Sequence, residues 1–583
     1  MVATGLSPAR WRQGLLLLWL VALLLLLTGL NGPPLLDWDE GIVARVALEL
    51  SQRPWAERLW PTYWGDPYLN KPPGLHLLVA ATINSWRGLS PAPVAALPPP
   101  WLLRLAPAVI SSLLAPLLAL VQLQLRPGER LTALLTGTLA LTLLPLLRHG
   151  HLLMLDGSQL VCMVLLWWAL LAAGPANDGS RLQAAPAGHG LLAGLATSGL
   201  LLLKAPAALP LLLGTLLLRL LERTLSGRQW GLLALGLALG LVPGLAWHAG
   251  HLGVRGGDAL QMWLGQGFAR IGTALEGNSG GPQTPVLEVL EGGWPWLPLW
   301  PFGMALAWRQ RRTRAGLWCL GLSVLTAGLV LPLRTQLPWY SLLLWPSFAL
   351  VCAPALVWLL RRDRPGRPPG ARVVAAIPWL WSLLGAVLLM AGSLAAMAAV
   401  WIRQGATALG GGGAGPSAGS ATAISLQATL AGLPLHLLAP CALALGAGLL
   451  VGGLLLSSAS LRRRQQGLGV LLLGDGLALL LLFASPLWLW ELNETWPVAD
   501  GLALLQEAGA GRDGAEVRLW RQGERPSLNW SMQKQIRPEN HINLAPDGAI
   551  WLLGLESAEA PGLRCRTLGQ RGRLRLERCQ AVP

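Results

Sequence analysis

The sequence predicts an all-α polytopic membrane protein with about 13 transmembrane helices and a small extracytoplasmic C-terminal α/β domain. Of its 583 residues, 53% are apolar and only 12% are charged, whereas soluble proteins carry about 25% charged residues. Apolar runs recur that are long enough to form the cores of membrane spans, as in 14–27, 205–218 and 441–456. A water-soluble globular protein would need more polar surface than this chain has.

Thirteen apolar segments are predicted to cross the membrane. The first is treated as an uncleaved span, because no small-residue cleavage site closes it. The predicted spans are 14–31, 101–125, 131–147, 158–174, 189–203, 206–221, 230–248, 295–308, 316–332, 340–360, 374–400, 432–457 and 467–490.

Basic residues predict the orientation of these spans in a bacterial inner membrane. With the N-terminus in the cytoplasm, the short inner loops hold arginines, as the positive-inside bias requires. These are Arg126, Arg130, Arg181, Arg219, Arg223, Arg228, Arg309, Arg311, Arg312, Arg314, Arg361, Arg362, Arg364, Arg367, Arg372 and Arg462–Arg464. We therefore divide the chain into a transmembrane domain, 1–492, with a first outer loop at 32–100, and a periplasmic domain, 493–583. The net charge of +16 follows from topology, so no nucleic-acid partner is expected.

Both outer segments contain predicted secondary structure. In the first outer loop, apolar residues share one face of 40–52, which predicts an amphipathic interfacial helix capped by Asp39, and 72–86 is a second candidate helix. In the tail, the runs 516–520, 527–532 and 549–555 are β-prone. Cys565 and Cys579 lie in this tail and are expected to form a disulfide if the compartment is oxidising.

Rare residue types gather in the first outer loop. The chain has three lysines and three tyrosines, yet Tyr63, Tyr68 and Lys71 fall within nine residues. A compact ammonium binds phosphate as a point charge, which makes Lys71 a candidate ligand. The alternative is a lysine that extends to the membrane interface beside an aromatic belt.

Acidic residues lie at the predicted outer ends of two spans. Asp39 and Glu40 follow the first span, and Asp156 lies near the start of the fourth. Carboxylates serve as general bases, and acids near membrane depth are costly and often functional. Helix capping is the alternative for each of them.

Five motifs together carry a family resemblance. They are Asp39-Glu40, Tyr68-x-x-Lys71-Pro72-Pro73, Asp156, Leu203-Lys204-Ala205-Pro206 and Leu337-Pro338-Trp339-Tyr340-x-x-Leu343-x-x-Pro346. In this combination the chain resembles the aminoarabinose-transferase and protein mannosyltransferase branch of the C-type glycosyltransferases. The number of spans and the outer tail are most similar to the aminoarabinose transferases.

The resemblance implies transfer of a sugar from a polyprenyl-phosphate donor to a glycolipid or protein acceptor at the outer face of the inner membrane. It assigns the catalytic carboxylate to Asp39 or Glu40, with Asp156 as a further acid. It assigns the donor phosphate to Tyr68, Lys71 and Arg270, and we add Lys204 and Tyr340 to this set. A lipid A-like glycolipid, another envelope glycan and protein hydroxyls are all open as acceptors.

The chain departs from the family pattern where a metal is concerned. The aminoarabinose transferases usually carry Glu before the motif lysine and a His in the later outer loop. This chain has Asn70, and no His lies between His251 and His436. No protein-ligated metal is therefore predicted, and a divalent metal as cofactor is left open. A secondary transporter and a non-catalytic membrane scaffold are the alternative functions.

Overall fold

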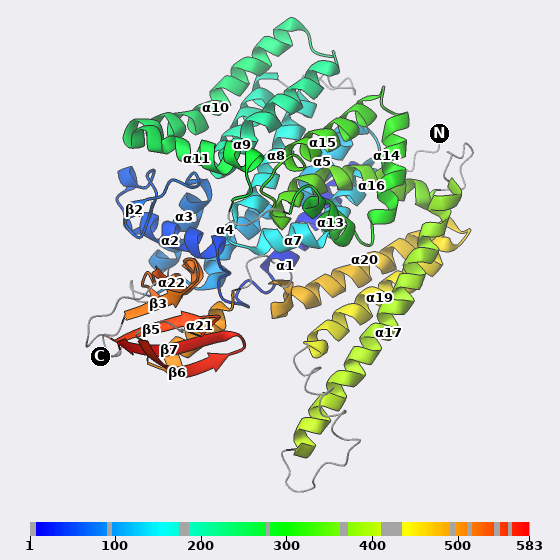
Figure 1. The fold of residues 1–583 in the computed structure, drawn as a ribbon. Helices are drawn as coiled ribbons and strands as arrows, with labels where there is room; N and C mark the ends of the chain where they lie inside the picture. Colours follow the sequence, from blue (N-terminus) through cyan, green and yellow to red (C-terminus); the bar gives the residue numbers. More distant parts are fainter. Residues whose placement is uncertain are drawn as a thin grey trace.

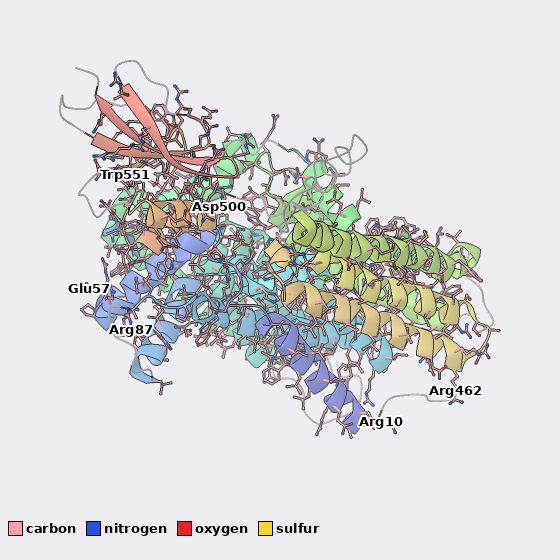
Figure 2. All side chains as sticks on the ribbon, turned by 90° about the horizontal axis from the view of Figure 1, so that it is seen from below. Arg10, Glu57, Arg87, Arg462, Asp500 and Trp551 are labelled. Atoms are coloured by element: carbon pink, nitrogen blue, oxygen red, sulfur yellow. A yellow bond between two sulfur atoms is a disulfide. The ribbon has the colours of Figure 1, made fainter. Side chains whose placement is uncertain are left out.

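The computed structural model describes residues 7–89, 96–173, 186–275, 280–361, 371–409, 434–489, 496–509, 516–540, 549–557 and 563–581. Helices form most of the molecule, and a small sheet domain lies at one end (Figure 1). Arg10 and Arg462 lie at one end of the helical body, whereas Asp500 and Trp551 lie toward the other (Figure 2). A helical body with a C-terminal sheet domain is the fold class that the sequence predicts.

The described residues contain nine helices that are long and apolar enough to cross a membrane, or ten if one bent pair counts as a span. The predicted number of thirteen is therefore not confirmed. The bent pair is α6 (Arg130–Ala140) with α7 (Leu144–His151), at 59°, and it overlaps the predicted span 131–147. The other helices of the body are α1 (Pro8–Leu27), α4 (Pro100–Ser111), α5 (Leu114–Leu125), α8 (Leu155–Ala172), α9 (Pro186–Leu221), α10 (Gly227–Arg255), α14 (Trp300–Arg309), α15 (Arg314–Val330), α16 (Trp345–Leu360), α17 (Ala371–Leu409), α19 (Leu435–Ser457) and α20 (Leu461–Phe483).

Two predicted spans, 189–203 and 206–221, lie within α9. The backbone breaks at Lys204, with φ −146° and ψ 74°. Gly190 approaches Leu233, and Gly194 approaches Gly240, so the first half of α9 runs parallel to α10. Only a short connection joins the end of α9 to the start of α10. The second half of α9 must therefore run in the opposite direction to its first half and to α10. Lys204 therefore lies at a reversal of the chain.

Small residues let several helices pack closely. A Cβ atom at Gly194 would lie 2.7 Å from Cα of Gly240, and one at Gly448 would lie 2.8 Å from Cα of Gly474. These contacts join α9 to α10 and α19 to α20. Such small-residue contacts are typical of helices that associate within lipid. In Figure 1, α17, α19 and α20 form a three-helix group beside the main body.

The first outer loop contains both predicted helices. They are α2 (Asp39–Gln52) and α3 (Gly74–Leu89), with a short hairpin of β1 (Thr62–Tyr63) and β2 (Asp66–Pro67) between them. The predicted cap is wrong, because Trp38 is the N-cap residue and Asp39 is the first helical residue. Most of α2 is buried, packed against α3 and α22, and its predicted position at the membrane interface stays a prediction.

The C-terminal domain is a five-stranded sheet with order β4-β3-β5-β7-β6. Its strands are β3 (Glu516–Trp520), β4 (Pro538–Glu539), β5 (Ala549–Gly554), β6 (Leu563–Arg571) and β7 (Leu574–Ala581), and its helices are α21 (Val498–Glu507) and α22 (Pro526–Met532). The prediction of a β-prone run at 527–532 is wrong, because this segment forms α22 between the parallel strands β3 and β4. Cys565 and Cys579 lie opposite each other on β6 and β7 and form a disulfide.

Candidate active site

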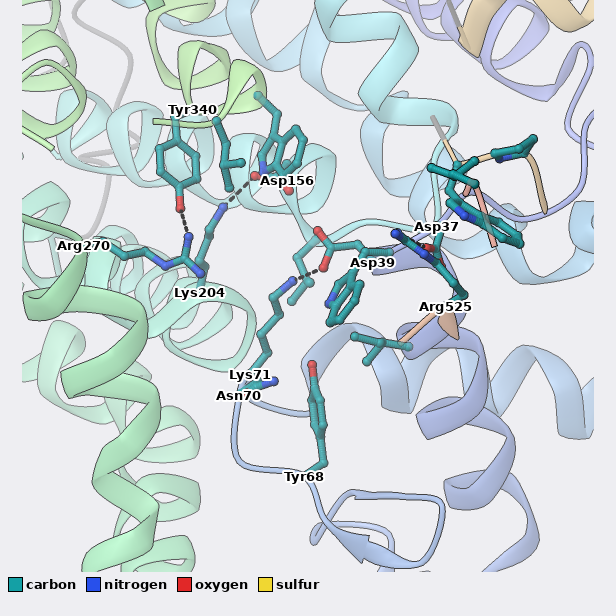
Figure 3. Close-up of a pocket in the computed structure, with 18 of the residues that line it drawn as sticks. Asp37, Asp39, Tyr68, Asn70, Lys71, Asp156, Lys204, Arg270, Tyr340 and Arg525 are labelled. Atoms are coloured by element: carbon teal, nitrogen blue, oxygen red, sulfur yellow. Dashed lines mark hydrogen bonds and ion pairs between the residues drawn. The ribbon is translucent and has the colours of Figure 1, made fainter. Parts of the chain in front are cut away.

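A carboxylate and an ammonium group from the first outer loop meet at the start of α2. Asp39 begins α2, and Lys71 lies just before α3. The ammonium of Lys71 donates to Oδ1 of Asp39 at 2.5 Å. Their side chains are 14% and 20% exposed, and both line a cavity that is shown in Figure 3. The pair is thus partly shielded from water but open to a ligand.

The sequence after Lys71 explains how the loop reaches the helical body. Pro72 and Pro73 keep the backbone extended before α3 begins at Gly74. A Cβ atom at Gly74 would lie 2.6 Å from the carbonyl oxygen of Leu202. Only glycine permits this approach, which brings the Lys71 segment against the chain reversal at Lys204.

Burial and charge set the protonation of this part of the site. Burial disfavours the ammonium of Lys71, but the charge and hydrogen bond of Asp39, together with Tyr68 and Asp156, outweigh burial, so the pKa of Lys71 is raised. Burial raises the pKa of Tyr68 to about 12. Its hydroxyl therefore keeps its proton, and in Figure 3 it points toward Asp39. Lys71 is a fixed cation and Tyr68 is a neutral hydrogen-bond donor.

A second ion pair lines the same cavity. The ammonium of Lys204 donates to Oδ1 of Asp156 at 2.8 Å. Asp156 lies in the first turn of α8, and the broken backbone at Lys204 turns that side chain out of α9. The ammonium also lies 5.1 Å from the ring centroid of Tyr340, within the range of a cation–π contact.

Arg270 enters the same cavity from the later outer segment. It lies in α12 (Ala269–Gly272) and donates to the hydroxyl of Tyr340 at 2.9 Å. Its carbonyl oxygen accepts from the backbone N–H groups of Arg334 and Thr335. These bonds join α12 to the segment that leads to Tyr340, so the two side chains are held together (Figure 3).

Glu40 is separated from the cavity although it is adjacent to Asp39. It is 1% exposed and forms an ion pair at 2.6 Å with Arg104, which is 0% exposed. The backbone N–H groups of Leu36 and Leu153 also donate to its carboxylate. With its oxygens occupied in this way, Glu40 connects the first outer loop to α4 and to the segment between α7 and α8. The structure thus supports Asp39, and not Glu40, as the acid that faces a ligand.

The cavity therefore collects seven of the eight predicted site residues and leaves out Glu40. The seven lining residues are Asp39, Tyr68, Lys71, Asp156, Lys204, Arg270 and Tyr340. They come from five separate parts of the chain: the first outer loop, α8, α9, α12 and the segment that contains Tyr340. Their roles in a reaction stay predictions.

Sequence analysis missed one whole wall of the cavity. The C-terminal domain supplies Trp496, Asp500, Arg525, Arg571 and Arg573 to the lining. Asp37 and Trp38, beside the predicted Asp39, also line it. The density of arginines in 564–578 was visible in the sequence, but nothing there indicated that the hairpin of β6 and β7 reaches the outer loop.

Two cavities share one wall. The polar cavity has a volume of about 780 Å³. A second cavity of about 410 Å³ is lined mainly by apolar side chains, including Leu160, Leu213, Phe268 and Leu343. Five residues line both cavities: Asp156, Lys204, Arg270, Trp339 and Tyr340. A ligand with a charged head and a long apolar tail would match this arrangement.

No three His, Cys, Asp or Glu side chains converge as metal ligands among the residues that the structure describes. Asn70, the residue before Lys71, lines the polar cavity. An amide oxygen is a weaker cation ligand than a carboxylate. The expectation about a divalent metal stays a prediction.

His76 gives the first outer loop a measurable pH dependence. It is fully buried, its ring lies 5.5 Å from that of Tyr68, and burial lowers its pKa to about 3. Below pH 6.5 the unfolded chain takes up a proton on His76 that the folded chain does not. The free energy of unfolding therefore decreases as the pH is lowered. From pH 6.5 to 5 we expect the wild type to lose about 2 kcal/mol more than His76→Phe. Thermal unfolding across this range measures the difference, and equal slopes would contradict it.

No family model and no curated protein matches the chain. Its fold is similar to that of solved membrane proteins. It aligns with the crystal structure of ArnT from Cupriavidus metallidurans bound to undecaprenyl phosphate, with a TM-score of 0.63 and 18% identity over 98% of this chain and 97% of that one. It aligns with the apo state of the same protein with a TM-score of 0.65 and 17% identity, over 98% of each chain. The chain therefore has the fold of the aminoarabinose transferase ArnT, which confirms the fold expected from the resemblance to C-type glycosyltransferases.

Proposed function

We propose that the protein transfers a sugar from a polyprenyl-phosphate donor to an acceptor at the outer face of a bacterial inner membrane. One observation carries this proposal: a polar cavity with paired acids and cations shares a wall with an apolar cavity. A polyprenyl-phosphate sugar has the matching chemistry, with a polar head and a long hydrocarbon chain. The similarity to ArnT does not favour the secondary-transporter alternative.

The apolar cavity supports the lipid part of the donor. Its walls include Pro206, Leu209 and Leu213 from α9 and Phe268 and Ile271 from the later outer segment. Leu209, Leu213, Phe268 and Ile271 are each at least half exposed, so this cavity has access to the bilayer. The crystal structure of ArnT that shares the fold is bound to undecaprenyl phosphate.

The cations support stabilisation of the leaving group. When the bond between sugar and phosphate breaks, negative charge develops on the phosphate oxygens. Lys71 and Arg270 would stabilise that charge, with Tyr68 donating a hydrogen bond, in a site partly shielded from water. Fixed donors of this kind lower the barrier because they need no reorganisation during the reaction.

The acid supports activation of the acceptor. Asp39 would remove the proton of an acceptor hydroxyl as its oxygen attacks the anomeric carbon. The new bond to oxygen forms as the bond to the donor phosphate breaks, so a single displacement inverts the anomer. With a phosphate acceptor, which is already nucleophilic, Asp39 would mainly position the group. The sugar is a hexose or a pentose, and the acceptor is a lipid A-like glycolipid, another envelope glycan or a protein hydroxyl.

Two features support the outer face as the location of the cavity. Arg10 and Arg462 lie at the end of the helical body opposite the C-terminal domain (Figure 2), as expected if that end is cytoplasmic. The disulfide between Cys565 and Cys579 is typical of oxidising compartments such as the periplasm.

Mass spectrometry of envelope lipids and glycoproteins tests the proposal. Deletion of the gene is expected to remove one sugar increment from one class of acceptor. Purified protein in lipid nanodiscs, given the polyprenyl-phosphate form of that sugar, is expected to restore the increment. An unchanged envelope, with uptake of a solute into proteoliposomes, would contradict the proposal and support a transporter.

Binding of the donor phosphate predicts a further result. Loss of a hydrogen bond to a charged group costs about 1.5–3 kcal/mol. Arg270→Ala is therefore expected to weaken binding of polyprenyl phosphate by about 10- to 100-fold. Arg334→Ala is the matched control, because Arg334 is exposed near Arg270 but lines neither cavity. Titration in nanodiscs measures both, and equal affinities would remove Arg270 from the phosphate site.

A further inference from the structure

The C-terminal domain contacts the first outer loop directly beside Asp39. Asp37, two residues earlier, is 1% exposed. Its Oδ2 atom accepts from Nη1 of Arg525 at 3.2 Å, and its Oδ1 atom accepts from the backbone N–H of Ser527 at 3.1 Å. The charge that pairs with Asp37 therefore comes from another domain, 488 positions later in the chain.

Three further contacts hold the C-terminal domain against the first outer loop. The hydroxyl of Ser527 donates to the carbonyl oxygen of Leu36. The hydroxyl of Tyr63 donates to Glu524 at 2.9 Å. A Cβ atom at Gly41 would lie 2.3 Å from the backbone nitrogen of Ser527, so α2 begins in direct contact with the C-terminal domain. Residues on both sides of Asp39 are thus fixed by one short segment, 524–527.

Burial makes this contact sensitive to its charges. Burial raises the pKa of Asp37, while Ser527 and Arg525 oppose that shift. Arg525 is 23% exposed and lies 5.5 Å from the ring of Trp496. A buried carboxylate without its partner is costly, so loss of Arg525 is expected to move the loop.

We propose that Asp37 and Arg525 form a positioning pair, through which the docked C-terminal domain holds Asp39 in place for transfer. This inference rests on the proposed function. Neither residue needs to touch the reacting atoms. Their effect passes through the backbone of 37–41 to Asp39, so docking of the domain is a condition of turnover. Misplacement of a reacting group by about 1 Å lowers a rate by about 100-fold.

Kinetics of four variants test the pair. Asp37→Asn keeps an oxygen for Ser527 but removes the charge, and Arg525→Gln removes the other charge. Each is expected to lower kcat by about 100-fold with the donor KM unchanged. Since both break one contact, the double variant is expected to fall no further than either single variant. Arg525→Lys, which retains the charge, is expected to recover most of the turnover.

Two other variants separate positioning from general damage. Gly41→Ala is expected to reproduce the loss of turnover without a change in charge, because it forces the two segments apart. Arg521→Gln is the control, since its ion pair with Glu556 lies within the C-terminal domain and is largely exposed. It is expected to leave turnover unchanged. A rise in donor KM at constant kcat in Arg525→Gln would overturn the inference, because Arg525 would then bind the donor directly.

Amide hydrogen exchange gives a readout that needs no transfer. Exchange in 36–44 is expected to speed up in Asp37→Asn, Arg525→Gln and Gly41→Ala, but not in Arg521→Gln. Unchanged exchange in the first three variants would overturn the inference even if the wild type is active. A wild type without transfer, but with faster exchange in these variants, would refute the proposed function and leave the docking contact intact.

Discussion

Lys71→Ala is expected to lower kcat for sugar transfer by about 100- to 1,000-fold, the cost of removing one fixed donor to a developing negative charge. The raised pKa of Lys71 keeps its ammonium charged, so the variant loses a full charge in a site that is only 20% exposed at this side chain. The loss of activity should appear in kcat rather than in the level of expression. Lys71 forms its ion pair with Asp39 at the surface of the cavity and not in the core of the helical body. Turnover of purified protein with its polyprenyl-phosphate donor measures the effect.

Lys534→Ala is the matched control for this experiment. Lys534 is exposed in the C-terminal domain and does not line the polar cavity. Membrane insertion and thermal unfolding of both variants are expected to match the wild type. Near-normal turnover of Lys71→Ala would remove Lys71 from the donor site and with it the main cation of the proposed mechanism.

Asp39→Asn and Glu40→Gln are expected to fail in different ways. Asp39→Asn removes the proposed base and should lower kcat by about 10²- to 10⁴-fold with little change in stability. Glu40→Gln leaves the buried Arg104 without its counter-charge and should destabilise the fold by about 3–5 kcal/mol. The reason is their burial: the Asp39 side chain is 14% exposed in the cavity, and that of Glu40 is 1% exposed.

Two measurements on each variant distinguish these outcomes. Single-turnover kinetics report the chemical step, and thermal unfolding in detergent reports the stability. Glu40→Met with Arg104→Met replaces both charges by apolar groups and should recover stability relative to Glu40→Gln. Equal and small losses of turnover in Asp39→Asn and Glu40→Gln would remove the role of base from both residues.

The helical body was predictable because each of its helices is stabilised mainly by interactions between residues close in sequence. A helix within lipid satisfies its own backbone, so each apolar run can be recognised without knowledge of its neighbours. The number of spans was less predictable, because the bend between α6 and α7 depends on how helices pack. The break at Lys204, in contrast, lies between two spans that the sequence predicts separately, 189–203 and 206–221.

The C-terminal domain shows where short patterns fail. The run 527–532 is rich in residues that suit a strand or a helix, and it forms α22 because it crosses between two parallel strands. Strand pairing is set by partners distant in sequence. The β6–β7 hairpin and its place beside the outer loop therefore could not be derived from the residues of the hairpin itself.

The sequence by itself determined that this chain is a polytopic helical membrane protein, and it indicated seven residues that line one cavity. Rare lysines and tyrosines, and acids at span ends, are visible without coordinates because they are exceptions in an apolar chain. Only the tertiary structure decided that Asp39 faces the cavity while Glu40 is buried against Arg104, and that Arg525 reaches Asp37 from another domain. Neighbours in sequence differ by about 100° around a helix, so adjacent carboxylates enter different environments, and only the packing of distant segments decides which one meets a ligand.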